Sequence, residues 1–245
     1  MKKTYQSSIS VFFPCYNDSK SISKLVYDAN EVLKKITKDF EIIVIDDGSK
    51  DNSREVLKKI KKRLRRLKLI FHHQNKGYGG ALRSGFEAAS KDLIFYTDGD
   101  GQYDVRELPL LLNLMSDDIN FVNGIKMARQ DYKYRVVMGN LYSFIARWLF
   151  LLPTYDVDCD FRLIRKQLIK KLDLKSNSGS ICVELVKKAQ RKNAKFRQVS
   201  IHHYERKHGK SQFFRFNYLF NTFIGISKLW IKLMIIDTVK IRIKK

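Results

Sequence analysis

Short apolar runs alternate with amphipathic stretches through the first half of the chain. The runs are typical of strands that are buried on both faces, and they lie at 9 to 14, 41 to 46, 67 to 73, 92 to 97 and 119 to 124. Segments with helical periodicity separate them, at 19 to 37, 52 to 64, 79 to 90 and 105 to 116. Repeated strand–helix–strand units predict right-handed crossovers and a mostly parallel sheet flanked by helices.

The second half of the sequence is less regular. Residues 133 to 152 have the pattern of a helix with one apolar face, and a loop dense in aspartate, LPTYDVDCDFRLI, follows. A further helix is predicted over 179 to 193 and a strand over 195 to 204. The chain ends with an apolar segment over about 213 to 236 and a basic tail, VKIRIKK. We therefore expect one α/β domain with a short C-terminal appendage.

Polar loops follow the first four predicted strands. In chain order they are PCYND, DDGSKDNS, HHQNKGYGG and TDGDGQYD. Open parallel sheets bind ligands at the carboxyl ends of their strands. We therefore expect these loops to converge on one edge of the sheet and to form a binding site there.

The fourth loop, TDGDGQYD, carries carboxylates in alternate positions. Asp98 and Asp100, with Gln102, offer oxygen ligands suited to Mg²⁺ or Mn²⁺, which also bridges to phosphate oxygens. An EF-hand is excluded, because its sixth position would be Tyr103 instead of glycine and its twelfth Pro109 instead of glutamate. The alternative is an Asp-Gly turn that closes the strand. The presence of three other polar loops favours the metal site.

The glycine-rich segment KGYGGALRSGF opens a predicted helix, as phosphate-binding loops do. It is not the dinucleotide fingerprint, because Leu82 stands at the third glycine of that motif. GKS at 209 to 211 is not a Walker A loop, because Tyr204 stands where the loop needs a glycine. Tight packing of the helix start is the alternative role for these glycines.

The second loop places two adjacent carboxylates after a predicted strand. One of Asp46 and Asp47 would face a nucleotide base or ribose, and the alternative is a turn. For Asp51 and Asn52 we expect the structural role of capping the next helix.

Charge and composition limit the class of protein. The 245 residues include 48 Lys and Arg against 25 Asp and Glu, which gives a formal net charge of +23 and a pI of about 9.9. Hydrophobic residues make up 44%, which is far too much for a disordered chain. The three cysteines lie far apart without a C-x-x-C motif, which argues against a disulfide scaffold or structural zinc and favours a reducing compartment.

The basic run KKIKKRLRRLK, at 58 to 68, has three explanations. Most such runs are solvated faces, and nucleic acid and an anionic membrane surface are the two candidate partners. No aromatic residues are interleaved with these charges, so the membrane surface fits better and no nucleic acid is expected.

The apolar segment near the C-terminus predicts an amphipathic helix over 213 to 236. Its polar positions fall on one stripe, at Asn217, Asn221, Gly225, Lys228 and Lys232. Such a helix suits the bilayer interface, and packing on the catalytic domain or on another subunit is the equal alternative. We expect neither a signal peptide nor a spanning helix, because no apolar run is long enough.

Taken together, the motifs resemble the family 2 glycosyltransferases with a GT-A fold, and among them the polyprenyl-phosphate sugar transferases such as dolichyl-phosphate mannose and glucose synthases. The resemblance spans roughly residues 8 to 212 and rests on the order and spacing of FFPCYND, IVIDDGS, NKGYGGALRSG, YTDGDGQYD, DCDFRL and RKHGKS. It implies a GT-A, Rossmann-like nucleotide-diphospho-sugar transferase sheet.

The resemblance also implies roles for individual residues. It assigns the nucleotide sugar to Pro14, Tyr16, Asp18, Asp46, Asp47, Asn75, Gly79, Asp98 and Gly99. It assigns the metal to Asp98, Asp100 and Gln102. The acceptor phosphate or the diphosphate would meet Lys126, Arg135, Arg206, His208 and Lys210. Two positions depart from the usual pattern, since Asp18 stands where glutamate is usual and Lys126 where many relatives have arginine.

The implied reaction is the metal-dependent, inverting transfer of a hexose from a UDP- or GDP-sugar to a polyprenyl phosphate. Negative charge grows on the leaving β-phosphate, where Mg²⁺ or Mn²⁺ and cationic side chains stabilise it. A phosphate acceptor has a second pKa of about 6 and arrives largely as an oxyanion, so it needs no strong base. Asp100 and Asp160 are the expected catalytic residues, with Asp160 as base or acceptor-orienting group. The alternative for Asp160 is a loop aspartate paired with Arg162.

We expect residues 1 to 212 to form the GT-A catalytic domain and 213 to 245 an amphipathic basic extension that contacts the membrane or another subunit. The protein would act peripherally at the cytoplasmic face of the membrane, in cell-envelope glycan synthesis or modification. A second copy or a membrane protein is left open as a further partner. Two alternatives are transfer to a sugar or lipid hydroxyl, which would make Asp160 indispensable, and a basic nucleotide- or nucleic-acid-binding module without catalysis.

Overall fold

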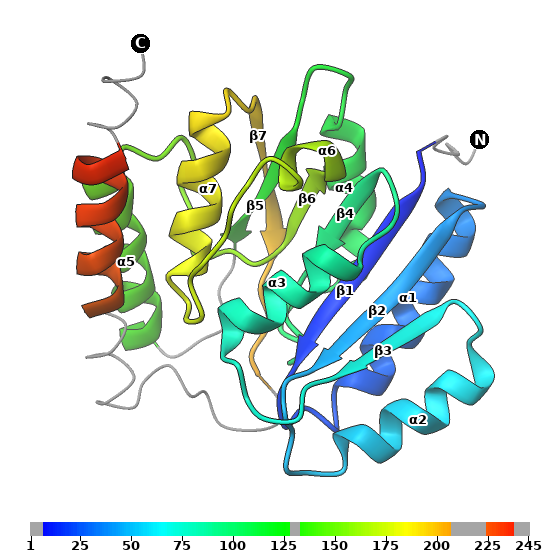
Figure 1. Ribbon diagram of the computed structural model, residues 1–245. Helices are drawn as coiled ribbons and strands as arrows, with labels where there is room; N and C mark the ends of the chain where they lie inside the picture. The colour runs from blue at the N-terminus through cyan, green and yellow to red at the C-terminus, as the bar shows by residue number, and fades with distance from the viewer. Residues whose placement is uncertain (1–6, 128–132, 207–223, 238–245) are drawn as a thin grey trace.

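The computed structural model describes residues 7–127, 133–206 and 224–237 and shows a seven-stranded sheet between layers of helices (Figure 1). The strands are β1 (Ile9–Cys15), β2 (Phe40–Asp46), β3 (Leu67–Phe71), β4 (Leu93–Tyr96), β5 (Phe121–Met127), β6 (Arg162–Arg165) and β7 (Phe196–His202). Their order across the sheet is β3-β2-β1-β4-β6-β5-β7. All neighbouring pairs are parallel except those that β6 makes with β4 and β5. The predicted α/β class with a mostly parallel sheet is confirmed.

The helices follow the predicted alternation. They are α1 (Ile22–Ile36), α2 (Ser53–Arg63), α3 (Tyr78–Ala88), α4 (Leu108–Leu114), α5 (Lys133–Phe150), α6 (Lys166–Ile169) and α7 (Ile181–Arg191), with a 3-10 turn η1 (Val105–Glu107) before α4. A last helical segment covers 224–237 and includes the π-helical stretch η2 (Ile231–Ile236). Residues 213–223 of the predicted C-terminal helix lie outside the described residues.

The sheet has a separate apolar core on each face. Alternate residues of β1 face opposite sides, so Val11 packs with α1, α2 and α4, whereas Phe12 packs with α3 and α7. The segment 224–237 joins the second core through Leu229 and Leu233, which are buried. One of the two roles predicted for this segment, packing on the catalytic domain, is therefore observed for its described part.

Strand β6 was not predicted as a strand, because its residues close the aspartate-rich segment that the sequence favours as a loop. It has four residues with an arginine at each end, which is too short and too polar for a strand pattern. Pairing with β4 on one side and β5 on the other defines it. In the described ranges, none of the helices combines the length and apolarity needed to cross a membrane.

Candidate active site at the carboxyl edge of the sheet

Three loops meet where β1, β2 and β4 end. Cys15 of β1 pairs with Asp46 of β2, and the β4 loop comes against the end of β1. A Cβ atom on Gly99 would lie 2.5 Å from the carbonyl oxygen of Pro14, so the close approach of the two loops requires glycine there. Ser21 at the start of α1 donates a hydrogen bond to the Gly99 carbonyl oxygen over 2.8 Å. This contact fixes the loop that carries Asp98, Gly99 and Asp100.

Arg206, from the chain beyond β7, joins two of the loop carboxylates. Its Nη2 lies 2.9 Å from Asp18 Oδ1 and its Nη1 lies 3.5 Å from Asp100 Oδ2. Burial and the Asp100 carboxylate raise the pKa of Asp18 to about 6, while Arg206 opposes this shift. The edge therefore holds more negative charge than its arginine balances.

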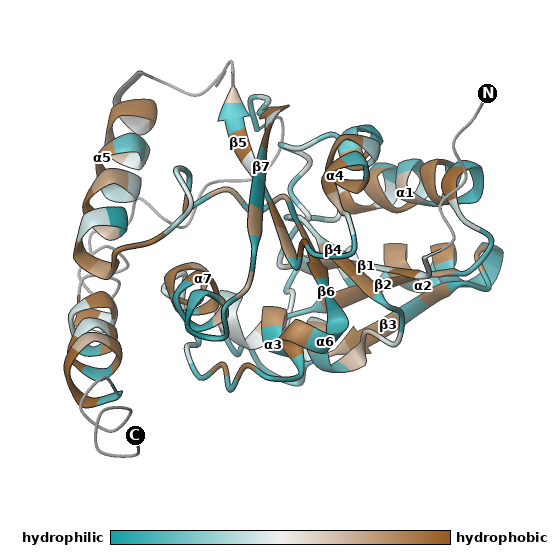
Figure 2. Ribbon diagram, turned by 90° about the horizontal axis from the view of Figure 1, so that it is seen from above, coloured by the Kyte–Doolittle hydropathy of each residue, from teal (hydrophilic) through white to brown (hydrophobic). Residues whose placement is uncertain are grey.

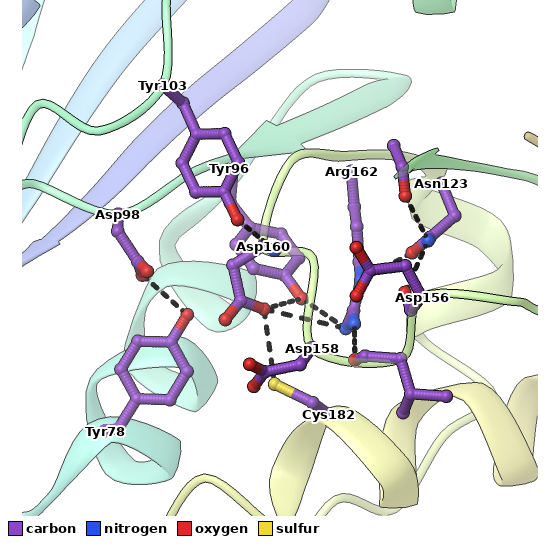
Figure 3. A network of polar contacts seen from close by, with 12 residues as sticks. Tyr78, Tyr96, Asp98, Tyr103, Asn123, Asp156, Asp158, Asp160, Arg162 and Cys182 are labelled. Atoms are coloured by element: carbon purple, nitrogen blue, oxygen red, sulfur yellow. Dashed lines mark hydrogen bonds and ion pairs between the residues drawn. The ribbon is translucent and has the colours of Figure 1, made fainter. Parts of the chain in front are cut away.

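Asp98, two residues before Asp100, points toward Tyr78 (Figure 3). The Tyr78 hydroxyl, at the start of α3, donates to Asp98 Oδ1 over 2.7 Å. Burial raises the pKa of Asp98 well above its usual range, and the carboxylates of Asp160 and Asp100 raise it further. A cation beside Asp98 would relieve this repulsion.

These side chains fit a divalent cation that the diphosphate of a donor helps to hold. Among the described residues no group of three or more His, Cys, Asp and Glu side chains forms a metal cluster by itself. Mg²⁺ is commonly held by one or two carboxylates together with substrate phosphates and water, and Asp98 and Asp100 supply such carboxylates. Gln102 is held beside them, because its N–H donates to Asp100 Oδ1 over 3.0 Å and its Nε2 to the Tyr204 carbonyl oxygen over 3.0 Å.

Asp46 and Asp47 are both buried and both serve the loop that follows β2. Asp46 Oδ1 accepts from Arg54 Nε over 2.7 Å, while its Oδ2 has no hydrogen-bond partner among the described residues. Asp47 Oδ1 lies 2.6 Å from Nδ1 of the buried His72 and accepts the Lys76 N–H over 2.8 Å. In this conformation both carboxylates make contacts within the protein that hold the loop after β2 in place.

The glycine-rich segment makes a close backbone contact. A Cβ atom on Gly79 would collide with the carbonyl oxygen of Ser176, and the Gly79 N–H donates to the Asn177 carbonyl oxygen over 2.9 Å. The tight-packing alternative is thus observed at Gly79. Asn75, in the same segment, donates through Nδ2 to the Asp47 carbonyl oxygen over 3.1 Å.

Asp160 is buried in a polar network behind the cluster (Figure 3). Its Oδ1 accepts from the Tyr96 hydroxyl over 3.4 Å and from the Cys182 thiol over 3.2 Å. It also lies 3.8 Å from Nη1 of Arg162, which is the pairing named above as the alternative for Asp160.

Lys126, on β5, is tied to the aspartate-rich segment. Its Nζ donates to the Asp158 carbonyl oxygen over 2.7 Å and lies 3.5 Å from Asp156 Oδ1. Only 3% of the Lys126 side chain is exposed, so its charge in this conformation serves these acidic partners. Arg135 belongs to α5 but its side chain is outside the described part, and His208 and Lys210 lie outside the described residues.

Several polar residues of the site were not expected from sequence. Tyr78 supports Asp98, Tyr96 supports Asp160, and His72 supports Asp47. The one available signal was Tyr78, a large residue between two glycines after a polar loop. Tyr96 ends the apolar strand β4, where nothing in the pattern marks a buried polar partner.

Comparison with known proteins connects this geometry to a family. The family model described as Glycosyl transferase family 2 matches residues 10–173. Two curated relatives are each 26% identical to this chain over 206 residues, which cover 84% of this chain and 62% of the relative. They are the undecaprenyl-phosphate 4-deoxy-4-formamido-L-arabinose transferases of Yersinia enterocolitica and Yersinia pestis. The chain thus spans about 62% of the length of these curated relatives.

Solved structures show the same fold at lower identity. Glucosyl-3-phosphoglycerate synthase from Mycobacterium tuberculosis, in complex with Mn²⁺, UDP and glucosyl-3-phosphoglycerate, matches with a TM-score of 0.66 and 18% identity, over 83% of this chain and 73% of that one. Its complex with Mn²⁺, UDP and phosphoglyceric acid matches equally well, with a TM-score of 0.66. The predicted GT-A fold is confirmed by this likeness.

Proposed function

Because this chain belongs to the glycosyl transferase family 2, we propose that it transfers a hexose from a UDP- or GDP-sugar to a polyprenyl phosphate, with inversion at the sugar carbon. The observation that carries the proposal is the meeting of Asp18 and Asp100 with Arg206 at the carboxyl edge of the sheet, next to the buried carboxyl group of Asp98. The printed activity of the Yersinia relatives, transfer to undecaprenyl phosphate, supports the acceptor class.

The donor diphosphate would lie against this edge. Asp98 and Asp100, with Gln102 beside them, would hold Mg²⁺ or Mn²⁺, which when bound supplies positive charge to the leaving phosphate. The two Mycobacterium tuberculosis complexes named above contain Mn²⁺ and UDP, which supports this part of the proposal. Arg206 would contribute its own charge to the diphosphate and give up part of its pairing with Asp18 and Asp100.

The acceptor side would use the network around Asp160. A lipid phosphate reaches the site largely ionised, since its second pKa is about 6, and needs orientation more than deprotonation. Asp160 Oδ1 is already engaged by Tyr96, Cys182 and Arg162, which suits an orienting role. Transfer to a hydroxyl group, the alternative, would require Asp160 to accept a proton from the acceptor.

We further propose that residues 1 to 212 form the catalytic domain, that 213 to 245 form an extension, and that the protein works peripherally at the cytoplasmic face of the membrane in cell-envelope glycan synthesis. The described part of the extension packs on α7, where Arg191 Nη1 lies 3.5 Å from Asp237 Oδ2.

Donor turnover with radiolabelled UDP- and GDP-sugars tests the function. We expect label in the organic phase only when polyprenyl phosphate and Mg²⁺ or Mn²⁺ are present, and loss of this product in Asp100→Ala. Asp104→Ala is the matched control, because Asp104 lies in the same loop but pairs with Arg106 at 2.8 Å. Nucleotide release without lipid product would favour a hydroxyl acceptor. An inactive protein that binds nucleic acid tightly would overturn the proposal.

A further inference from the structure

Helix α5 has a broad apolar face that no other described part of the chain covers. Seven large side chains on it are 45% to 66% exposed, namely Val137, Met138, Leu141, Phe144, Ile145, Trp148 and Leu149. They recur at helical spacing on one side, while Ala146 and Phe150 are buried on the opposite side. Soluble monomers rarely expose a contiguous apolar surface of this extent, so this outer face of α5 is expected to bind a partner.

The apolar surface continues beyond α5. Leu151 and Tyr155, just after the helix, are 61% and 60% exposed. The segment 224–237 lies beside α5 at the side of the molecule remote from α2, as Figures 1 and 2 show together. A hydrogen bond from Trp230 Nε1 to the Leu149 carbonyl oxygen, 2.9 Å long, joins the two helices.

The charges near this face are cationic. Neither 133–150 nor 224–236 contains an aspartate or glutamate. Lys228 and Lys232 are exposed on the neighbouring helix, and Arg147 lies over the Tyr155 ring at 4.2 Å. Apolar and aromatic side chains bordered by cations complement an anionic lipid surface. A second copy of this chain would instead bring its own charge of +23 against the first.

The inner face of α5 borders the acidic network, because Ala146 and Phe150 share an apolar core with Cys182, whose thiol donates to Asp160 Oδ1 over 3.2 Å. Tyr142 on this side of the helix is half-buried, and its pKa is raised by burial of the hydroxyl and by the carboxylates of Asp158 and Asp160 and the Cys182 thiol. One α-helix, about 10 Å across with its side chains, therefore separates the outer face from the acidic network. A lipid head group at a bilayer that touches α5 would be held within reach of this network.

We propose that the outer face of α5 docks the protein onto an anionic lipid bilayer, with Phe144 and Trp148 inserted into the interface. The purpose of this contact, to present a membrane-bound acceptor phosphate, rests on the proposed function. The evidence for the contact itself is the exposure of the apolar side chains and the charge around this face. It assigns the membrane contact to α5, ahead of both the C-terminal helix and the basic run at 58 to 68.

Vesicle co-sedimentation of the full chain tests this assignment. The probes are vesicles of equal phosphatidylglycerol and phosphatidylcholine, and vesicles of phosphatidylcholine alone. We expect binding to the anionic vesicles and at least a tenfold weaker affinity for the double variant Phe144→Glu/Trp148→Glu. Leu110→Glu, which places the same charge at a 41% exposed leucine of α4, is the matched control and should retain binding. Far-UV circular dichroism checks that each variant is folded.

Unchanged vesicle affinity in the folded double variant would overturn the proposal. So would a wild-type dimer that the double variant converts to a monomer without any loss of vesicle binding, because the face would then bind a second copy. Vesicle binding is measured without a nucleotide sugar, so a failure of sugar transfer leaves it unaffected. Transfer to a short-chain polyprenyl phosphate in detergent is measured separately, so the proposed function stands or falls on its own result.

Discussion

Replacement of Arg162 tests whether one buried guanidinium holds the network behind the site. Arg162 has no exposed surface. Its Nε donates to Asn123 Oδ1 and its Nη1 to the Tyr96 hydroxyl, each over 2.8 Å, and its Nη2 donates to the Val157 carbonyl oxygen. Its charge also faces Asp160 at 3.8 Å. Arg162→Met removes every donor and the charge while keeping much of the side-chain volume.

The expected loss of stability follows from the partners left behind. Removing one member of a buried ion pair costs about 3–5 kcal/mol. Each buried acceptor that loses its donor costs about 1–3 kcal/mol, but neighbouring groups in one network do not add simply. We therefore expect Arg162→Met to lower the free energy of unfolding by about 4 kcal/mol. Arg162→Lys keeps the charge but cannot match the planar fork, and about 2 kcal/mol is expected.

Urea unfolding followed by far-UV circular dichroism measures these losses. The midpoint should fall in the order wild type, Arg162→Lys, Arg162→Met, with an unchanged slope against urea concentration. Arg165→Met, at the other end of β6, is the matched control. It removes a partly exposed arginine that donates to the Ile119 and Ser116 carbonyl oxygens, so a loss of about 1 kcal/mol is expected. A loss below about 1 kcal/mol in Arg162→Met would refute the reasoning from buried unpaired groups.

Three further substitutions have definite expected outcomes. Tyr78→Phe removes the 2.7 Å hydrogen bond to Asp98, so kcat/KM for the nucleotide sugar should fall about tenfold to a hundredfold; an unchanged value would show that the bond does not hold Asp98 for catalysis. Burial alone would raise the pKa of Glu41, but hydrogen bonds from a lysine and two serines lower it to about 2. The stabilisation by Glu41 is therefore complete above about pH 4.5 and is lost as the pH falls towards 2. The difference in unfolding free energy between wild type and Glu41→Gln should shrink over that range. A difference that widens towards pH 2 would contradict the lowered pKa of Glu41. Gly79→Ala should destabilise the protein by about 1–3 kcal/mol in urea unfolding, because the new Cβ meets the Ser176 carbonyl oxygen; a stabilisation, as expected for alanine in an open helix position, would show that the contact relaxes freely.

The fold was predictable because its strands are buried on both faces. The predicted run 41 to 46 is apolar at its four central positions, and it corresponds to β2, Phe40–Asp46, in which every residue is buried. β6 could not be found in the same way, because Leu163 and Ile164 are its whole apolar content. Its strand conformation comes from the two strands that pair with it. At Arg162 the paired residues are Tyr96 and Asn123, which lie 66 and 39 residues earlier in the chain.

The location of the site followed from a general rule, whereas its side-chain partners did not. Loops after parallel strands meet at one edge of the sheet whatever their sequence, so the sequence was enough to predict that the loops of Asp18, Asp98 and Asp100 come together. The partner of a charged side chain depends on tertiary placement. Lys126 is the clear case. The family resemblance assigned it to the acceptor phosphate, whereas the acidic loop that encloses it lies about thirty residues further along the chain.

The carboxylates at the strand ends contrast with the positive net charge of the whole chain. A chain with a net charge of +23 attracts anionic ligands over its whole surface, yet the strand ends gather carboxylates. A diphosphate would be repelled by Asp18, Asp98 and Asp100 if it arrived alone, and Arg206 offsets only part of their charge. The edge suits a ligand that arrives together with a cation, because each carboxylate then gains a partner when the anion binds. Acidic residues at the centre of a basic protein are therefore consistent with an anionic donor, provided that a divalent ion accompanies it.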